Sequence, residues 1–482
     1  MNFLSNFKYQ YYLFQLENYD ISRYLKLALR NFGQNKEQRQ SLVWTLKLKA
    51  IVVLAIVLWV LTSIIGLLLM MRHFTFNLWE RIGVLIIYLF VLSLLNFIYL
   101  IVASLVLYPL DYFLKNRIIN RAKNKIKTFK NLKVIGIAGS YGKTTAKEIV
   151  AAVLSTKYKI LETPDNINTP LGISELINTK LNNDIDIFIV EMGEYTKGDI
   201  KDICDIVHPT YSILTGINEA HFERMGSLEN AVGTIFELVE NSNGPVLLNA
   251  DDRLIVENYK KYAQNRGIQF YSAYNSELSE YKINNKVFKE DASGFEFNVF
   301  IKDVLFGEFK SKLLGEYSLG TIISGMILGK IFDIPIDKIR LAIVSLKPVA
   351  HRLEPIINSI GTIVIDDSYN GNPDGVREAI KLLKKFSKRR KVYITPGLVE
   401  TGPKAQEIHL QIGKELGKVA DVVILIKNSV CAYIVEGLMA VDFPKENIYI
   451  FNSALEAHGH LAGLIKKDDV VLFQNDWPDN YL

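Results

Sequence analysis

Residues 139–144 combine the groups that a phosphate-binding turn needs. In the segment AGSYGKTT, Gly139 and Gly142 let the backbone approach phosphate oxygens closely. Lys143 supplies positive charge, and Thr144 can place a hydroxyl on Mg²⁺. The spacing is shorter than the common Walker form, which has a glycine where Ile137 stands, and a Gly-Lys-Thr triplet also arises by chance. The strand-like KVIGIAG before the turn and the helical pattern after it favour nucleotide binding.

Polar side chains also follow two later apolar segments. DIFIVEMG ends its apolar run with Glu191, and YSILTGINEAH ends with Asn218 and then His221. Ligands bind at the carboxyl ends of strands in open α/β sheets, so Glu191 is a candidate Mg²⁺ ligand on the same sheet edge as Lys143. The alternatives are a solvated glutamate at a strand exit and a structural histidine.

A second α/β segment carries its own charged residues. HRLEP places Arg352 near its start, and TIVIDDSYNGNP ends a strand with Asp366 and Asp367. An arginine and acids beyond the nucleotide-binding segment indicate a second domain that closes over the ligand and excludes water from an activated intermediate. For the acidic stretch alone, a polar turn is the alternative interpretation.

These stretches, in this order, resemble the Mur ligase family. The resemblance rests on GSYGKTT, NTPLGI, EMGEYTKGDI, TGINEAHFERMGSLEN, NADD, HRLEP, DDSYNGNP and TPGLVETGPKAQEIH, which together cover about residues 130–415. It is nearest to the branch that adds D-alanyl-D-alanine to UDP-N-acetylmuramoyl-tripeptide. It implies an ATP-dependent, ADP-forming ligase of cell-wall precursor synthesis, in which a peptide carboxylate becomes an acyl phosphate and an amine displaces the phosphate.

The resemblance also implies roles for individual residues, with ATP and Mg²⁺ as cofactors. The expected catalytic residues are Lys143, Glu191, His221 and Arg352. The expected nucleotide contacts are Gly139, Ser140, Tyr141, Gly142, Lys143, Thr144, Thr145, Asn218, Asp252, Arg352 and Asp366. The expected Mg²⁺ ligands are Thr144, Glu191 and His221, and the expected substrate contacts are Asn168, Thr169, Tyr369, Asn370 and Asn372.

Three segments depart from the family pattern. Ile235 stands where many members carry a carbamylated lysine, and Glu237 or Glu240 could replace the missing negative charge on a second Mg²⁺. LLGEYSLGT replaces a turn that contacts the nucleotide. Near the end of the chain, the usual Lys-Gly-Ser is replaced by Gln474, Asn475 and Asp476.

The start of the chain departs most, because it contains two apolar runs. Ala50–Met71 and Gly83–Leu110 carry no charge, and at about 1.5 Å per residue each exceeds the roughly 30 Å hydrocarbon thickness of a bilayer. A buried core helix is the alternative for either run. Lysine and arginine crowd the outer flanks, which predicts a two-pass protein of the cell membrane with both termini and the catalytic domains cytoplasmic. The aromatic and basic residues 3–30 lie either along the membrane interface or on the soluble domain.

The charge of the chain follows these flanks. The segments 1–49, 72–81 and 111–133 together carry a net charge of +13, whereas the whole chain carries +5. Residues 134–482 are therefore net −8, which argues against nucleic acid as a partner. The basic residues after the second run indicate contact with anionic membrane lipids.

The expected architecture is α/β with three parts. Residues 1–130 form a membrane region with two transmembrane helices, at about 50–71 and 83–110. Residues 131–348 form an ATP-binding domain with a mainly parallel sheet and antiparallel strands at its edge, and residues 349–482 form a smaller Rossmann-like domain.

The membrane region stands where the family has a UDP-sugar-binding domain, so the peptide-bearing partner is either lipid-linked or UDP-linked, and the amine is an amino acid or dipeptide. Two other functions remain open. One is a Mur-type ligase or amidating enzyme with a lipid-linked or non-murein substrate. The other is a membrane-anchored nucleotide-binding scaffold without ligase activity.

Overall fold

A computed structural model describes most of the chain. The described residues are 3–30, 41–73, 78–94, 96–164, 167–218, 225, 227–264, 266–358, 361–369, 371–398, 401 and 404–474. The chain divides into two compact units, with the boundary between Arg117 and Ile118.

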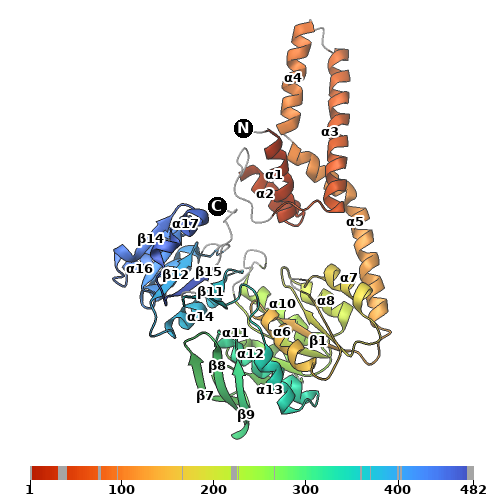
Figure 1. Ribbon diagram of the computed structural model, residues 1–482. Coiled ribbons are helices and arrows are strands. Elements are labelled where there is room, and N and C mark those ends of the chain that lie inside the picture. The colour runs from red at the N-terminus through yellow and green to blue at the C-terminus, as the bar shows by residue number, and fades with distance from the viewer. Residues whose placement is uncertain are drawn as a thin grey trace. The chain divides into compact units, whose positions relative to one another are not determined.

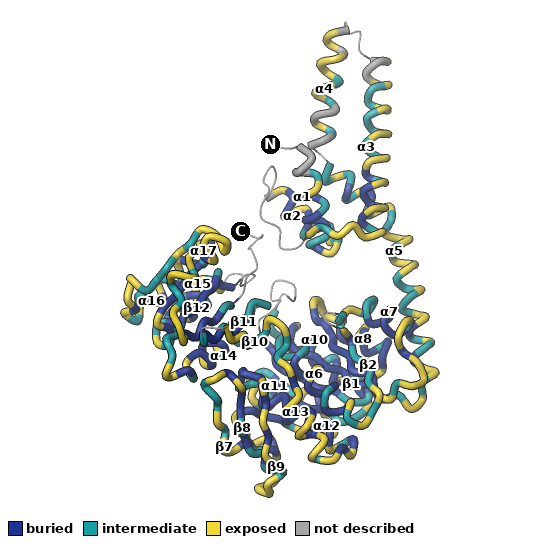
Figure 2. Tube along the Cα trace, viewed as in Figure 1, coloured by how far each residue is buried: buried dark blue, intermediate teal, exposed yellow. Residues whose placement is uncertain are grey.

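The first unit is helical. Its elements are α1 (Phe3–Leu16), α2 (Ile21–Arg30), α3 (Leu46–His73), α4 (Leu78–Leu94) and the first part of α5 (Asn96–Ile126). Two helical segments, Leu46–Leu69 and Asn96–Ile126, are long and apolar enough to cross a membrane. Only 17% and 11% of their apolar windows are buried, which distinguishes them from core helices of a soluble domain. Figure 2 shows exposed residues along α3, α4 and α5.

The second apolar run contains parts of two described helices. Helix α4 ends at Leu94 and α5 begins at Asn96, and residue 95 between them lies outside the described residues. Among the described residues the second candidate span is α5, which continues to Ile126 and includes the basic segment after the apolar run.

The N-terminal helices pack on α3 and α5. The buried face of α1 carries Tyr12, Leu13 and Phe14, and it belongs to one apolar cluster with Ile51 of α3 and Leu100 of α5. Residues 3–30 therefore cover the base of the apolar helices.

The second unit contains a six-stranded parallel sheet in the order β2-β3-β1-β4-β5-β6. Strand β1 is labelled in Figure 1. Its strands are β1 (Lys133–Ala138), β2 (Ile160–Glu162), β3 (Ile187–Glu191), β4 (Tyr211–Leu214), β5 (Val246–Asn249) and β6 (Ile268–Tyr271). Strand β1 lies between β3 and β4, with Ile137 opposite Glu191. After β1 the chain forms β2 and β3 toward one edge of the sheet and then β4 toward the other edge, so the direction of the strand order reverses beside β1. Ligands bind at the carboxyl ends of strands near such a reversal, which is where β1 and β3 end.

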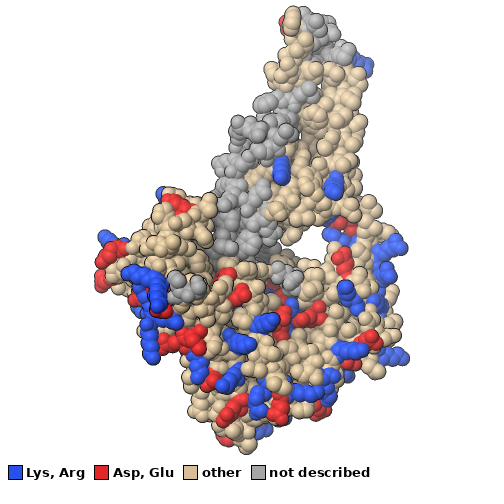
Figure 3. All heavy atoms as spheres, in the orientation of Figure 1, with Lys and Arg blue, Asp and Glu red and all other residues tan. Residues whose placement is uncertain are grey.

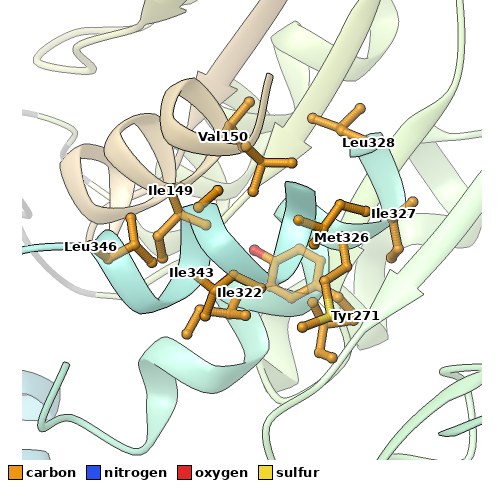
Figure 4. Packing of buried hydrophobic residues seen from close by; sticks show 14 of the residues in the cluster. Ile149, Val150, Tyr271, Ile322, Met326, Ile327, Leu328, Ile343 and Leu346 are labelled. Carbon is orange, nitrogen blue, oxygen red and sulfur yellow. The ribbon is translucent and has the colours of Figure 1, made fainter. Parts of the chain in front are cut away.

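Helices cover both faces of this sheet. They are α6 (Lys143–Leu154), α7 (Pro170–Lys180), α8 (Asp199–Val207), α10 (Leu228–Glu240), α11 (Arg253–Tyr262), α12 (Tyr317–Ile331) and α13 (Ile336–Ser345). Ile149 of α6 packs with Met326 of α12 and Ile343 of α13, as Figure 4 shows. This apolar contact fixes the helix that starts at the phosphate loop.

The expected antiparallel strands form a separate three-stranded sheet. They are β7 (Tyr281–Lys289), β8 (Gly294–Ile301) and β9 (Val304–Ser311). Alternating aromatic residues such as Phe295, Phe297 and Phe309 face the core that includes α12 and α13.

The last part of the chain is a second six-stranded sheet, in the order β10-β11-β15-β12-β13-β14. Its strands are β10 (Glu354–Ile357), β11 (Ile363–Asp367), β12 (Lys391–Thr395), β13 (Val422–Ile426), β14 (Ile448–Phe451) and β15 (Val470–Gln474). Its helices are α14 (Pro373–Lys384), α15 (Ala405–Gly417), α16 (Cys431–Met439), α17 (Ala454–Leu464) and the short 3₁₀ helix η2 (Lys445–Asn447). All pairs are parallel except β10 with β11, and this confirms the Rossmann-like sheet; β10 itself was not expected.

Candidate active site

The turn after β1 has the geometry of a phosphate loop. Gly139 and Gly142 have φ angles of +146° and +76°, and α6 begins directly after Gly142. A Cβ atom at Gly139 would lie 2.2 Å from Oγ1 of Thr215, so only glycine fits there. The N–H of Ser140 donates to the carbonyl of Gly216 at 2.7 Å. The N-terminus of α6 therefore faces a loop whose shape is fixed by the neighbouring strand exit.

Lys143 makes an ion pair that the sequence did not predict. Its Nζ lies 3.0 Å and 2.9 Å from the two carboxylate oxygens of Glu194, and it also donates to the carbonyl of Gly139. Glu194 is buried, with 3% of its side chain exposed. Burial raises the pKa of Glu194, the Lys143 ammonium lowers it, and the nearby Glu191 carboxylate raises it further. The only signal in the sequence was a second acid three residues after Glu191.

Glu191 lies at the end of β3 with one carboxylate oxygen unpaired. The residue is 3% exposed, and its Oε1 accepts from Nδ2 of Asn168 at 3.4 Å. Its Oε2 is buried and accepts no hydrogen bond from any described residue. A buried carboxylate oxygen without a donor is costly unless a cation meets it, so this residue fits Mg²⁺.

The segment around Asn168 positions this carboxylate. The carbonyl of Asn168 accepts from the N–H of Gly193 at 2.8 Å, and a Cβ atom at Gly193 would meet Asn168. Thr169 caps α7 by accepting from the N–H of Gly172 at 3.3 Å. Asn168 is thus beside the carboxylates, whereas the side chain of Thr169 serves a helix end.

Asp252 fixes Tyr141 of the phosphate loop. Its Oδ2 accepts from the Tyr141 hydroxyl at 2.8 Å and from the N–H of Ile217 at 2.9 Å, while its Oδ1 caps α11 through Ile255. Burial raises the pKa of Asp252, and these donors oppose the shift. In this structure Asp252 therefore supports the loop and the strand exit together.

Asn218 joins the two α/β parts of the second unit. Its backbone N–H donates to Oγ of Ser140 at 3.2 Å. Its side-chain amide donates to Oδ1 of Asn372 at 3.3 Å and to Oδ2 of Asp374 at 3.1 Å. Asn372 also caps α14. The structure thus brings a predicted nucleotide contact beside a predicted substrate contact.

Arg352 stacks over Tyr369. Its guanidinium carbon lies 4.9 Å from the centre of the Tyr369 ring. Arg352 also borders a small cavity together with Thr145 of α6 and Tyr317 at the start of α12. The cavity lies between the helix that follows the phosphate loop and the start of the C-terminal part. Thr144 occupies the second position of α6.

The two aspartates at the end of β11 lie in different environments. Asp366 accepts from Ser368 and lies 2.7 Å from Nδ1 of His351. Burial raises the pKa of Asp366, but these hydrogen bonds outweigh it and leave the pKa lowered. Burial raises the pKa of Asp367 to about 7, although the N–H of Leu353 and the charge of Arg352 oppose the shift.

A second possible metal cluster lies at the end of β11. His351, Glu354 and Asp366 have ligand atoms within 4.8 Å of one another. The N–H of His351 donates to Glu354 at 3.0 Å, so these groups already satisfy one another through hydrogen bonds.

The departures from the family pattern have clear structural positions. Ile235 is fully buried in the apolar core beneath the sheet, so it offers no ligand. Glu237 accepts from the N–H groups of Gly198 and Lys201 and thus holds the start of α8. The suggestion that Glu237 replaces the missing carbamate is therefore wrong, and Glu240 is exposed at the end of α10.

Glu316, in the unusual LLGEYSLGT segment, pairs with Lys385 at 2.6 Å. Gln474 accepts from the Tyr393 hydroxyl at the end of β15. His221, Asn370, Asn475 and Asp476 lie outside the described residues.

The fold and site together define a class of protein. A phosphate loop and two buried carboxylates lie at the ligand-binding edge of a parallel sheet, and a second α/β domain contacts this edge through Asn218 and Asn372. This is the arrangement of an ATP-dependent ligase that works between two domains.

Comparisons with known proteins identify the family. Residues 137–327 match the model of the Mur ligase middle domain, and residues 351–474 match that of the Mur ligase, glutamate ligase domain. These matches cover more than half of the chain, which belongs to the Mur ligase family. Members of this family are ATP-dependent carbon–nitrogen ligases that use ATP and Mg²⁺.

Several relatives share one name, UDP-N-acetylmuramoyl-tripeptide--D-alanyl-D-alanine ligase. The Bacillus subtilis protein is 24% identical over 345 residues, which are 71% of this chain and 72% of the relative. The Escherichia coli protein is 27% identical over 291 residues, which are 58% of this chain and 61% of the relative. The match thus spans less than two thirds of most of these relatives.

Solved structures of the same type share the fold. MurF from Acinetobacter baumannii has a TM-score of 0.67 at 20% identity and covers 75% of this chain and 77% of its own. MurF from Thermotoga maritima, solved in complex with ADP, has a TM-score of 0.64 at 24% identity and covers 75% of this chain and 80% of its own.

Proposed function

We propose that this protein is a membrane-associated peptide ligase of cell-wall precursor synthesis, which couples ATP hydrolysis to amide formation. The observation that carries the proposal is the position of Lys143. It lies on a phosphate loop beside the buried carboxylates of Glu191 and Glu194, at the edge that Asn218 links to the second domain. We propose domain boundaries near residues 130 and 348, which separate the apolar helices, the ATP-binding domain and the C-terminal domain.

The chain's own residues have distinct roles in this proposal. Lys143 leaves Glu194 and binds the β- and γ-phosphates of ATP, because a transferred phosphoryl group needs charge neutralisation more than a covalent nucleophile. Arg352 approaches the same phosphates from the C-terminal domain. One Mg²⁺ bound by Thr144 and a second Mg²⁺ bound by Glu191 and His221 would neutralise further phosphate charge. Closure of the two domains excludes water from the activated carboxylate.

The reaction that we propose has two steps. A peptide carboxylate attacks the γ-phosphorus of ATP and releases ADP, which leaves an acyl phosphate. An amine then attacks the acyl carbon and displaces inorganic phosphate, which leaves an amide. The names of the relatives support D-alanyl-D-alanine as the amine and a muramoyl tripeptide as the acceptor. Asn168, Thr169, Tyr369, Asn370 and Asn372 are the residues that we propose contact these substrates.

The apolar helices favour an acceptor at a membrane. Exposed aliphatic residues run along α3 and α5, including Val57, Ile64, Leu68 and Leu105. Figure 3 shows few charged atoms on the described part of α3 and mixed charges over the α/β unit, whereas the second half of α5 is basic. We propose a two-pass anchor with the catalytic domains in the cytoplasm, and an acceptor peptide carried by a lipid that the bilayer concentrates and orients. A UDP-linked acceptor, with the helices as a simple anchor, is the alternative.

Phosphate release by the detergent-purified protein tests the proposal. The protein receives ATP, Mg²⁺ and D-alanyl-D-alanine with a UDP-linked tripeptide, with a lipid-linked tripeptide or with no acceptor. Release that depends on an acceptor, together with a product heavier by the dipeptide, supports the ligase and identifies the carrier. ATP binding without release under all three conditions contradicts this pair of substrates.

A scaffold without ligase activity is the second candidate, and the observation in its favour is Ile235. Ile235 stands in place of the lysine that many members use at the metal site, and its apolar side chain is buried in the core. The buried carboxylate of Glu194 weighs against this candidate, because it supplies negative charge near the same site.

A further inference from the structure

Glu194 is a buried carboxylate with a single strong partner. Both of its oxygens lie within 3.0 Å of Lys143 Nζ, and only 3% of its side chain is exposed. Lys143 also donates to the carbonyl of Gly139, so its ammonium group is held inside the phosphate loop.

Nucleotide binding must change this ion pair. The lysine of such a loop binds phosphate when a nucleotide enters, because the phosphates carry more negative charge than one carboxylate. Glu194 would then remain buried without its counter-charge. Removing one partner of a buried ion pair is strongly unfavourable unless another positive group replaces it.

A divalent cation can provide that replacement at this position. Glu191, three residues before Glu194 at the end of β3, has a buried Oε2 that accepts no hydrogen bond from a described residue. Two carboxylates beside bound phosphate form an oxygen-rich site of the kind that Mg²⁺ prefers.

The helix that carries Ile235 offers no alternative carboxylate to this site. Ile235 is buried among apolar side chains, and Glu237 is bound to the backbone N–H groups at the start of α8. Glu240 is exposed at the other end of the helix. Among the described residues of α10, then, none replaces a lysine-borne carbamate.

We propose that Glu194 exchanges Lys143 for a divalent cation when nucleotide binds, and that Glu194 and Glu191 together bind this cation. The inference rests on the proposed function, because it concerns the ATP site of the same ligase. In this proposal Glu194, on the loop after β3, supplies the negative charge that a carbamylated lysine on α10 would supply in other members of the family.

Mn²⁺ binding tests the exchange without turnover. Mn²⁺ is titrated into the full-length, detergent-purified protein with and without a non-hydrolysable ATP analogue, and free Mn²⁺ is measured by electron paramagnetic resonance. The variants are Glu194→Gln, the shortened but charged Glu194→Asp, and Glu229→Gln as a control on the surface of α10, where Glu229 is 84% exposed.

The exchange predicts a defined order of affinities. Glu194→Gln should weaken Mn²⁺ binding in the presence of the analogue by at least about tenfold, Glu194→Asp should lie between, and Glu229→Gln should match the wild type. Binding of the analogue without metal should be unchanged or tighter in Glu194→Gln, because Lys143 no longer has to leave a carboxylate.

Two results would overturn the inference in distinguishable ways. Equal Mn²⁺ affinity in the wild type and both Glu194 variants would make Glu194 a structural partner of Lys143 only, and the proposed ligase would stand. A wild-type protein that binds neither the analogue nor Mn²⁺ would contradict the ATP site itself, and with it both proposals. Circular dichroism of each variant identifies any loss of Mn²⁺ binding that comes from unfolding.

Discussion

The side-chain amide of Asn218 lies 3.3 Å from Oδ1 of Asn372, and the backbone N–H of Asn218 donates to Ser140 in the phosphate loop. One residue therefore contacts both the loop that would hold ATP and the cap of α14 in the C-terminal domain. Movement of one domain relative to the other must therefore change the hydrogen bond between Asn218 and Asn372. Asn218 is thus well placed to transmit closure of the C-terminal domain to the loop.

Asn218→Ala should slow turnover more than it weakens ATP binding. The substitution removes the side-chain hydrogen bonds to the C-terminal domain but keeps the backbone bond to Ser140. A net hydrogen-bond contribution of about 0.5–1.5 kcal/mol predicts a loss of roughly two- to thirteenfold in kcat. Steady-state ADP release measures kcat and KM. Asn258→Ala, which loses only a bond within α11, is the control, and a change confined to the KM for ATP would contradict the coupling.

Lys143→Ala should abolish nucleotide hydrolysis and also destabilise the protein. It leaves Glu194 as a buried carboxylate without a counter-charge, which typically costs about 3–5 kcal/mol. Thermal unfolding and phosphate release measure the two effects separately. Addition of Glu194→Gln should restore part of the stability and none of the hydrolysis. Lys201→Ala, at a lysine with 54% of its side chain exposed, should change neither, and normal hydrolysis in Lys143→Ala would remove the loop from the mechanism.

Much of the fold could be predicted because it depends on local patterns. Apolar runs that end in polar residues predicted β1, β3 and β4 of the first sheet and β11 of the second, and the antiparallel strands expected at the edge of the ATP-binding domain are β7, β8 and β9. The two glycines around Ser140 predicted the phosphate loop, since a turn directly before a helix needs their conformations. The first apolar run gave α3 within a few residues.

The interactions that were not predicted depend on contacts between distant segments. Nothing near Glu237 in the sequence indicates that its carboxylate caps α8. The nearer of its two hydrogen-bonded residues, Lys201, lies 36 residues earlier in the chain. The pairing of Lys143 with Glu194 likewise follows from the adjacency of β1 and β3, which is a property of the sheet order.

The apolar helices should keep the chain in membranes. The full-length protein should remain in the membrane pellet after extraction with alkaline carbonate, because the exposed aliphatic surfaces of α3 and α5 are removed from water there. A chain that starts at Ile118, where the second compact unit begins, should appear in the supernatant. Immunoblotting of the two fractions measures the partition. Release of the full-length protein by carbonate would contradict a spanning anchor.

The stability of the C-terminal domain should fall as pH rises toward neutrality, because of Asp367. Burial raises the pKa of this carboxyl to about 7, whereas its ordinary value is 3.8. Between roughly pH 4 and 7 the folded chain therefore retains a proton that the unfolded chain has released. The free energy of unfolding decreases with pH wherever the folded state binds more protons, so this contribution declines across that window and levels off above pH 7.

Asp367→Asn should remove this decline, because the amide has no proton to lose and keeps a similar shape. At pH 8 the variant should unfold at a temperature a few degrees above the wild type, since about 1 kcal/mol shifts Tm by about 2–4 °C in a domain of this size. Near pH 4 the two proteins should unfold together. Thermal unfolding from pH 4 to 8 measures the difference, with Asp442→Asn at an exposed position as the control. Because the charge of Arg352 lies close to Asp367, a variant less stable than the wild type at pH 8 would show that the folded protein keeps Asp367 ionised as the partner of Arg352.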